Sequence, residues 1–107
     1  MERTQTLVYN LIYTMLETDD PLNAVVRVQT FSTEKAAMDA LEAEYDDMVK
    51  SIEDGNTILD CVRKENNGNN ARIDLGYESQ DESDAGIPEV ETRHEWRVAK
   101  TTIDLHA

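Results

Sequence analysis

Cys61 is the single cysteine of the chain and its strongest nucleophile. A thiol becomes reactive when positive charge around it lowers its pKa, but the immediate neighbours of Cys61 are Asp60 and Val62. We therefore predict that Cys61 is a small residue of the hydrophobic core, without a catalytic role. A lone cysteine also excludes an internal disulfide, which favours a reduced, cytoplasmic setting.

Glu91, His94 and Glu95 are residue types that bind transition metals. In a strand, however, the adjacent residues His94 and Glu95 point to opposite faces, and the chain has only two histidines. We therefore expect no metal site here, and no cofactor.

Asp81, Ser83 and Gly86 match the start of a calcium-binding EF-hand loop. Position five of that loop would be Ala85 and position twelve Thr92, so the required bidentate acid is missing. The four glycines are too scattered to form a phosphate-binding loop. With no nucleophile beside a base, the sequence predicts a protein that is not an enzyme.

Negative charge is the strongest chemical signal in the chain, which has 23 acidic and 10 basic side chains and a formal net charge of −13. Two windows hold most of the excess. Residues 34–54 contain eight acids and two lysines, and residues 78–91 contain six acids and no base. Such a field repels nucleic acid and anionic membranes and favours a basic protein partner. The predicted partner-binding acidic face consists of Asp39, Glu42, Asp46, Asp47, Asp81, Glu82 and Asp84.

The elements that position these acids begin with two apolar segments. Residues 6–16 are compatible with a helix or a strand, because their apolar residues fit both periods. Their β-prone composition, the turn residues 18–23 and the β-branched run 24–31 favour a hairpin. If residues 6–16 were instead a helix, the order would become α-β-α-β-β-β.

An amphipathic helix is predicted to follow, with Ser32 as its N-cap and Gly55 as its left-handed end. At ~100° per residue its apolar side chains form one stripe, and the acids lie outside it. The stripe consists of Ala37, Met38, Leu41, Tyr45, Met48, Val49 and Ile52.

Three further strands are predicted at residues 57–64, 71–77 and 94–103, with a mobile acidic surface loop at 78–91. In the last strand, Trp96 and Val98 share one face and Arg97 and Ala99 the other. The prediction is one α+β domain over residues 1–107: a four- or five-stranded antiparallel sheet with one helix on one face, in ββαβββ order.

The order of elements, the helix start Phe31-Ser32-Thr33-Glu34-Lys35-Ala36-Ala37 and the late run Glu95-Trp96-Arg97-Val98 resemble small acidic proteins of bacterial phages and conjugative elements. Most such proteins have no assigned role, and the resemblance implies an accessory or inhibitor factor of a mobile element.

Two classes of function remain open. The first is a non-catalytic interaction protein that binds a basic protein surface. The alternative is a structural domain that forms a homodimer through its open sheet face or an edge strand, with the acids serving only solubility. A second alternative is mimicry of nucleic acid. The predicted helix carries one charge per ~4 Å, against one per ~1.7 Å in duplex DNA, so the helix alone is too sparsely charged to imitate a duplex. Direct nucleic-acid binding and membrane insertion are not expected.

Overall fold

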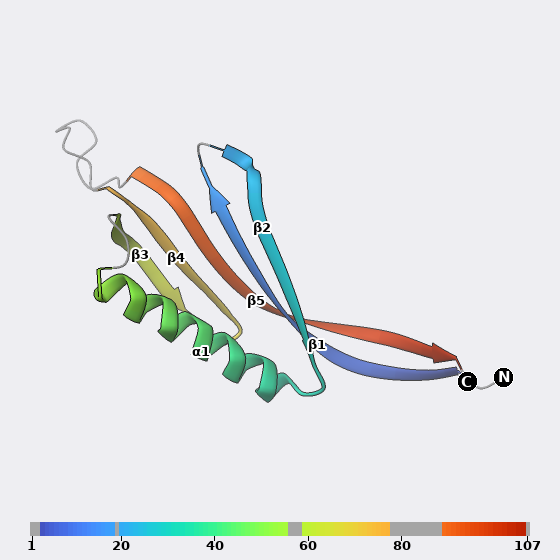
Figure 1. The fold of residues 1–107 in the computed structure, drawn as a ribbon. Helices are drawn as coiled ribbons and strands as arrows, with labels where there is room; N and C mark the ends of the chain where they lie inside the picture. Colours follow the sequence, from blue (N-terminus) through green and yellow to red (C-terminus); the bar gives the residue numbers. More distant parts are fainter. Residues whose placement is uncertain (1–2, 19, 56–58, 78–88, 107) are drawn as a thin grey trace.

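The computed structural model describes residues 3–18, 20–55, 59–77 and 89–106 of the chain. It contains β1 (Arg3–Glu17), β2 (Asp20–Phe31), α1 (Glu34–Glu53), β3 (Asp60–Asn66), β4 (Asn70–Tyr77) and β5 (Glu89–His106). The strands form one antiparallel sheet in the order β2-β1-β5-β4-β3, and α1 packs on one face of it (Figure 1). The predicted α+β fold with ββαβββ order is confirmed. Residues 6–16 are strand, so the helical alternative is wrong.

The first hairpin turns more tightly than its sequence suggests. The predicted turn ran from Thr18 to Asn23, but Glu17 already pairs with Asp20 and β2 starts there. Thr18 is held in place from across the sheet. Its backbone N–H donates to the carbonyl oxygen of Glu91 at 2.9 Å, and its hydroxyl donates to that of Val90 at 2.7 Å. Both acceptors belong to β5, which is distant in sequence, so the turn residues alone could not predict these contacts.

The predicted loop at 78–91 is partly wrong, because β5 begins at Glu89 and Val90 pairs with Gly76 of β4. A β-branched residue with a paired neighbour extends a strand even where the flanking residues are acidic. Residues 78–88 lie outside the described part of the chain, so the mobility predicted for this segment stays a prediction.

Helix α1 begins one residue later than predicted. Thr33, not Ser32, is the N-cap: its backbone is extended (φ −131°, ψ 150°) and its hydroxyl accepts from the backbone N–H of Ala36 at 3.1 Å. Two adjacent hydroxyl residues offer equivalent caps in the sequence, and the backbone geometry selects one. The end of the helix is as predicted, with Gly55 at φ +79° and its N–H bonded to Ile52.

The core lies between α1 and the sheet face formed by alternate residues of β1, β4 and β5. Its buried members are Leu11, Leu41, Tyr45, Ala71, Ile73, Leu75 and Trp96. Trp96 is 2% exposed and meets the ring edge of Tyr45 at a centroid distance of 5.9 Å. The predicted apolar stripe of the helix is confirmed, because Ala37, Leu41 and Tyr45 are its buried residues.

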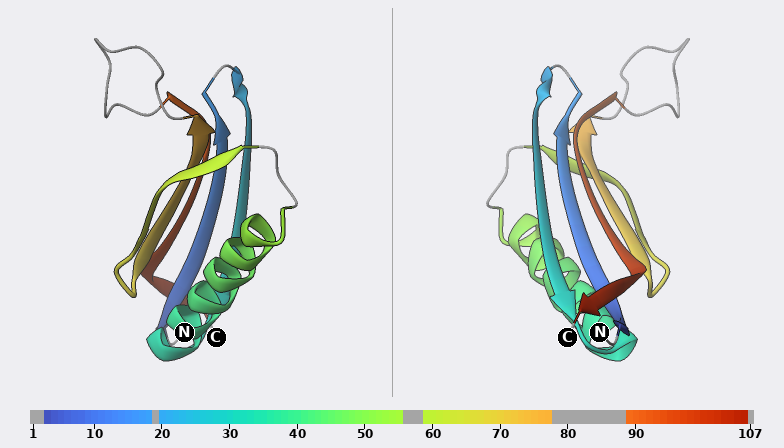
Figure 2. Two further views of the ribbon diagram at one scale, coloured as in Figure 1. Left: turned by 90° about the vertical axis from the view of Figure 1, so that its left-hand side faces the viewer. Right: turned by 90° about the vertical axis from the view of Figure 1, so that its right-hand side faces the viewer.

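The molecule is elongated, with principal extents of 67 × 27 × 22 Å. β2 ends opposite Tyr9 and β4 begins opposite Arg97, whereas β1 and β5 remain paired as far as Arg3 and His106. Residues 3–8 and 101–106 therefore form a two-stranded extension, the β1–β5 arm, that projects beyond the helix and carries both termini (Figures 1 and 2).

Candidate functional site

The outer side of α1 carries the acidic residues that the sequence identified. Asp39, Glu42, Asp46 and Asp47 are all exposed. Asp39, Glu42 and Asp46 recur at spacings of three and four residues, which places them in one row along the helix, with Asp47 beside it. This row faces away from the sheet because the stripe of Ala37, Leu41 and Tyr45 is buried against it. We call these four residues the helix acidic face.

Two acids of α1 are already engaged by bases of the same chain. Lys35 donates to Asp39 at 2.7 Å, and this hydrogen bond raises the pKa of Lys35. Arg27 of β2 donates to Glu44 at 2.6 Å. Within the described ranges, Glu42, Asp46 and Asp47 make no ion pair. These three carboxylates therefore carry the uncompensated charge of the helix acidic face.

The other predicted acids, Asp81, Glu82 and Asp84, lie outside the described residues. The structure thus brings together four of the seven residues predicted for a partner-binding face, all on one element.

A groove of about 350 Å³ runs along the margin of the helix acidic face, between α1 and the β1–β2 side of the sheet. Its lining includes Asp47 and Glu44 from the helix and Tyr13 and Arg27 from the sheet. The Arg27 guanidinium lies 4.8 Å from the centre of the Tyr13 ring while it bonds to Glu44. An arginine of a basic partner could make the same kind of contact on this side of the molecule, stacked on an aromatic ring and bonded to a carboxylate.

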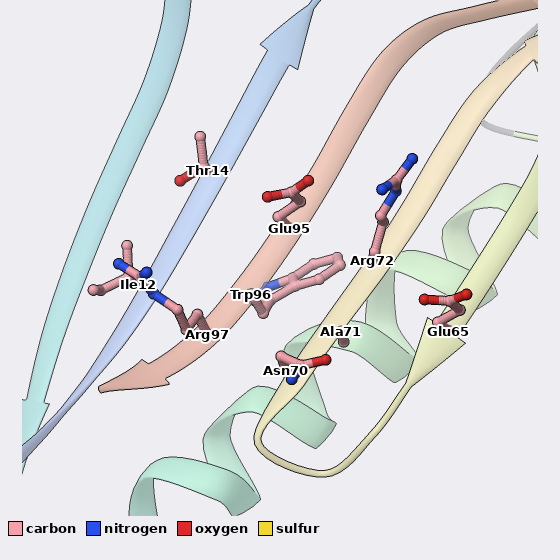
Figure 3. A pocket seen from close by; sticks show the side chains of 9 residues that line it. All are labelled: Ile12, Thr14, Glu65, Asn70, Ala71, Arg72, Glu95, Trp96 and Arg97. Atoms are coloured by element: carbon pink, nitrogen blue, oxygen red, sulfur yellow. The ribbon is translucent and has the colours of Figure 1, made fainter. Parts of the chain in front are cut away.

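The opposite face of the sheet contains a hollow of about 480 Å³, shown in Figure 3. Thr14, Glu95 and Arg72 form one row across β1, β5 and β4, which Glu65 of β3 continues. Arg72 lies directly opposite both Glu95 and Glu65, and Arg97 also lines the hollow, so its lining contains two acids and two bases. The hollow therefore has no excess charge to attract a charged ligand.

Asp74 is the most deeply buried charged group of that face, at 1% exposed. Arg72 donates to it at 2.7 Å and Arg93 of the neighbouring strand at 2.9 Å. Burial by itself would raise the pKa of Asp74, but the two arginine hydrogen bonds outweigh it and the pKa lies below its usual value. This cluster stabilises the pairing of β4 with β5.

His94 is 6% exposed and lies beneath the helix, where its Nδ1 and the hydroxyl of Tyr13 share a hydrogen bond of 2.6 Å. Burial lowers the pKa of His94 and raises that of Tyr13, so both are neutral near pH 7. Glu95 is exposed on the other face, as predicted. Among the described residues, no three His, Cys, Asp or Glu side chains are grouped so that they could hold a metal.

The aromatic contacts of this cluster were not foreseen from the sequence. Tyr13 stacks on His94 at 5.9 Å and meets Trp96 at 5.3 Å. Tyr13 and Trp96 each show the alternation of a half-buried strand, but only the pairing of β1 with β5 places them opposite one another. No acceptor for the Trp96 indole N–H is found within the described residues, so Trp96 contributes by packing.

The prediction that Cys61 belongs to the hydrophobic core is wrong. The residue is exposed on β3, an outer strand of the sheet, and is not part of the core. Cys61 pairs with the buried Leu75, but β3 has a neighbouring strand on one side only, and nearly all of its residues are exposed.

No helix among the described residues is long and apolar enough to cross a membrane. Comparison with models of protein families, with curated proteins and with solved structures finds no match to this chain. Its function must therefore be inferred from its own residues.

Proposed function

We propose that this protein is a non-catalytic interaction domain whose helix acidic face binds a basic surface of another protein. The observation that carries the proposal is the exposure of Glu42, Asp46 and Asp47 without internal counter-charges among the described residues. Glu44 and Asp74, by contrast, are engaged by bases of the chain.

The rigidity of α1 supports a binding role. The helix is capped at Thr33, ends at Gly55 and is anchored through Leu41 and Tyr45, so its outer carboxylates are held at fixed spacing. A preorganised row of charges loses little conformational entropy on binding. The contact of Arg27 with Tyr13 and Glu44 supports an arginine-rich partner surface, which could extend this pattern along the groove toward Asp47.

The same proposal holds that the protein is not an enzyme. Cys61 is exposed beside Asp60, His94 is buried against Tyr13, and the hollow of the sheet face is lined by two acids and two bases. The resemblance to small acidic proteins of phages and conjugative elements extends the proposal to an accessory or inhibitor factor that acts in the cytoplasm of a bacterial host.

The test is to neutralise the three uncompensated acids by Glu42→Gln, Asp46→Asn and Asp47→Asn. A matched control removes three exposed acids elsewhere, by Glu17→Gln, Asp20→Asn and Asp60→Asn. Partners are captured from host lysate on each protein at low salt, and their affinities are measured by titration with the purified partner.

We expect the helix variant to bind about three- to 150-fold more weakly than the control, since three exposed ion pairs of ~0.2–1 kcal/mol each total about 0.6–3 kcal/mol. Binding of the unmodified chain should weaken steadily with added salt. Equal affinities of the two triple variants would contradict the proposal.

A further inference from the structure

The two edges of the sheet are built differently. The outer strand β3 carries Asp60, Arg63, Lys64 and Glu65, and its register shifts after Cys61. Charged side chains and irregular pairing are the devices that keep an edge strand from pairing with another chain. The opposite outer strand, β2, has one charged side chain, that of Arg27, over residues 25–31. That segment has no acid, no lysine and no proline, and it pairs with β1 without a register shift.

The same segment exposes an unusual amount of apolar surface. Val25, Val26 and Val28 are 48%, 63% and 55% exposed, and Val26 and Val28 lie beside Thr14 and Ile12 on the open face of the sheet. Its single charge, on Arg27, is engaged by Glu44. In a chain of net charge −13, this edge is therefore locally close to neutral and strongly β-prone.

We propose that the β2 edge over residues 25–31 pairs with the same segment of a second copy, antiparallel about a twofold axis, to give a continuous ten-stranded sheet. An unpaired strand edge presents a row of backbone donors and acceptors that an antiparallel copy of itself satisfies. The charge distribution favours a second copy as well, because this edge lets two chains of net charge −13 meet without placing acids opposite each other.

The sequence of the segment selects one register. An axis through Val28, the middle residue, sets Val28 against Val28 of the second copy and pairs all seven residues. Arg27 then faces Gln29 rather than a second Arg27. Val25 faces Phe31, a β-branched residue against an aromatic one, which is a favourable cross-strand pair. This inference concerns β2 and is independent of the helix acidic face on α1.

Sedimentation or light scattering at low and high salt tests the proposal. We expect a dimer that persists or tightens in high salt, because screening reduces the repulsion between the two acidic chains while backbone pairing and apolar burial remain. Val28→Lys places two lysines opposite each other and should weaken the dimer by at least about tenfold. Cys61→Lys adds the same charge on the outer strand of the other edge and should leave the dimer intact.

Cysteine crosslinking tests the register in a Cys61→Ser background. Val28→Cys should give a disulfide-linked dimer on oxidation, whereas Val26→Cys, which would face Thr30 of the other copy, should not. Circular dichroism establishes that each variant is folded. If the chain is monomeric at every concentration, the proposal that β2 pairs with a second copy is wrong. A dimer that survives Val28→Lys would place the contact elsewhere, and crosslinking through position 26 would overturn the register.

Discussion

Asp74 shows how single residues on the open sheet face combine burial with charge. Its carboxylate is covered by the side chains of Arg72 and Arg93, which are themselves about 30% exposed (28% and 31%). The two arginines therefore keep part of their hydration while they satisfy the buried acid. Arrangements of this kind are destabilised more by removal of the buried partner than by removal of an exposed one.

Asp74→Asn is expected to lower the free energy of unfolding by about 1–3 kcal/mol at pH 7, since it removes charge-assisted hydrogen bonds. The folded-state pKa of Asp74 is depressed, so this contribution is present above the unfolded pKa of about 3.9 and is lost as the pH falls through the lower folded value. Urea denaturation at pH 7 and pH 3 measures the difference between variant and unmodified protein. Glu95→Gln, at an exposed acid 3.8 Å from Arg93, is the control and should cost less than about 0.5 kcal/mol.

His94 gives the opposite protonation behaviour beneath the helix. Because burial depresses its pKa, the unfolded chain takes up a proton near pH 6.5 that the folded chain does not. Stability should therefore fall as the pH drops below about 6.5, by at most ~1.4 kcal/mol per pH unit. His94→Asn keeps a hydrogen-bonding group near Tyr13 but does not titrate. Urea midpoints at pH 7.5 and pH 5 should fall further for the unmodified chain than for His94→Asn, and parallel changes would contradict this assignment.

At the scale of elements, patterns local in the chain were sufficient for the helix and for the number of strands. The stripe of Ala37, Leu41 and Tyr45 and the stop at Gly55 follow from spacing and from glycine's conformational freedom. Strand ends were less predictable. The start of β5 at Glu89 depends on its pairing with β4, and the start of β2 depends on contacts from Glu91. Such ends are set by residues distant in sequence.

The candidate site divides in the same way. The exposed acids of α1 could be predicted because helix periodicity alone assigns them to the outer side. The Tyr13–His94–Trp96 cluster could not, because it exists only when the first and last strands are adjacent. The exposure of Cys61 was missed for a related reason, since the sequence of β3 does not show that the strand lies at the edge of the sheet.

The N-cap of α1 provides a test at this scale. Thr33→Ala removes the acceptor for the Ala36 N–H and should destabilise the protein by about 1 kcal/mol. Ser32→Ala is a closely matched control, one residue away and exposed, and should change stability little. Thermal unfolding followed by circular dichroism at 222 nm distinguishes the two. An equal loss for both variants would mean that the two hydroxyls share the capping role.

At the scale of the whole molecule, the packing is uneven along the long axis. The helix lies against the part of the sheet away from the β1–β5 arm, and the arm has no helix over it and no third strand beside it among the described residues (Figure 1). Two-stranded ribbons are marginally stable in water by themselves. The arm is thus expected to open locally more often than the covered part of the same strands.

Hydrogen–deuterium exchange tests this expectation within single strands. Amides of residues 4–8 and 101–105 should exchange at least about tenfold faster than those of residues 10–15 and 93–98. The comparison is internal, because both sets belong to β1 and β5 and differ only in what covers them. Uniform protection along β1 and β5 would indicate that the arm is covered in solution by a partner.

The pairing of Arg3 with His106 also determines how the protein would respond to mechanical load. Tension applied through these two residues acts across the β1–β5 ladder, so the hydrogen bonds of the ladder break one after another from the arm inward. The force should stay low until the opening reaches Leu11 and Trp96, where the packed core resists it. A pull between Arg3 and Thr92, at opposite ends of the same ladder, would instead shear β1 along β5 and load many hydrogen bonds at once. The same fold is therefore mechanically weak along one direction and resistant along another.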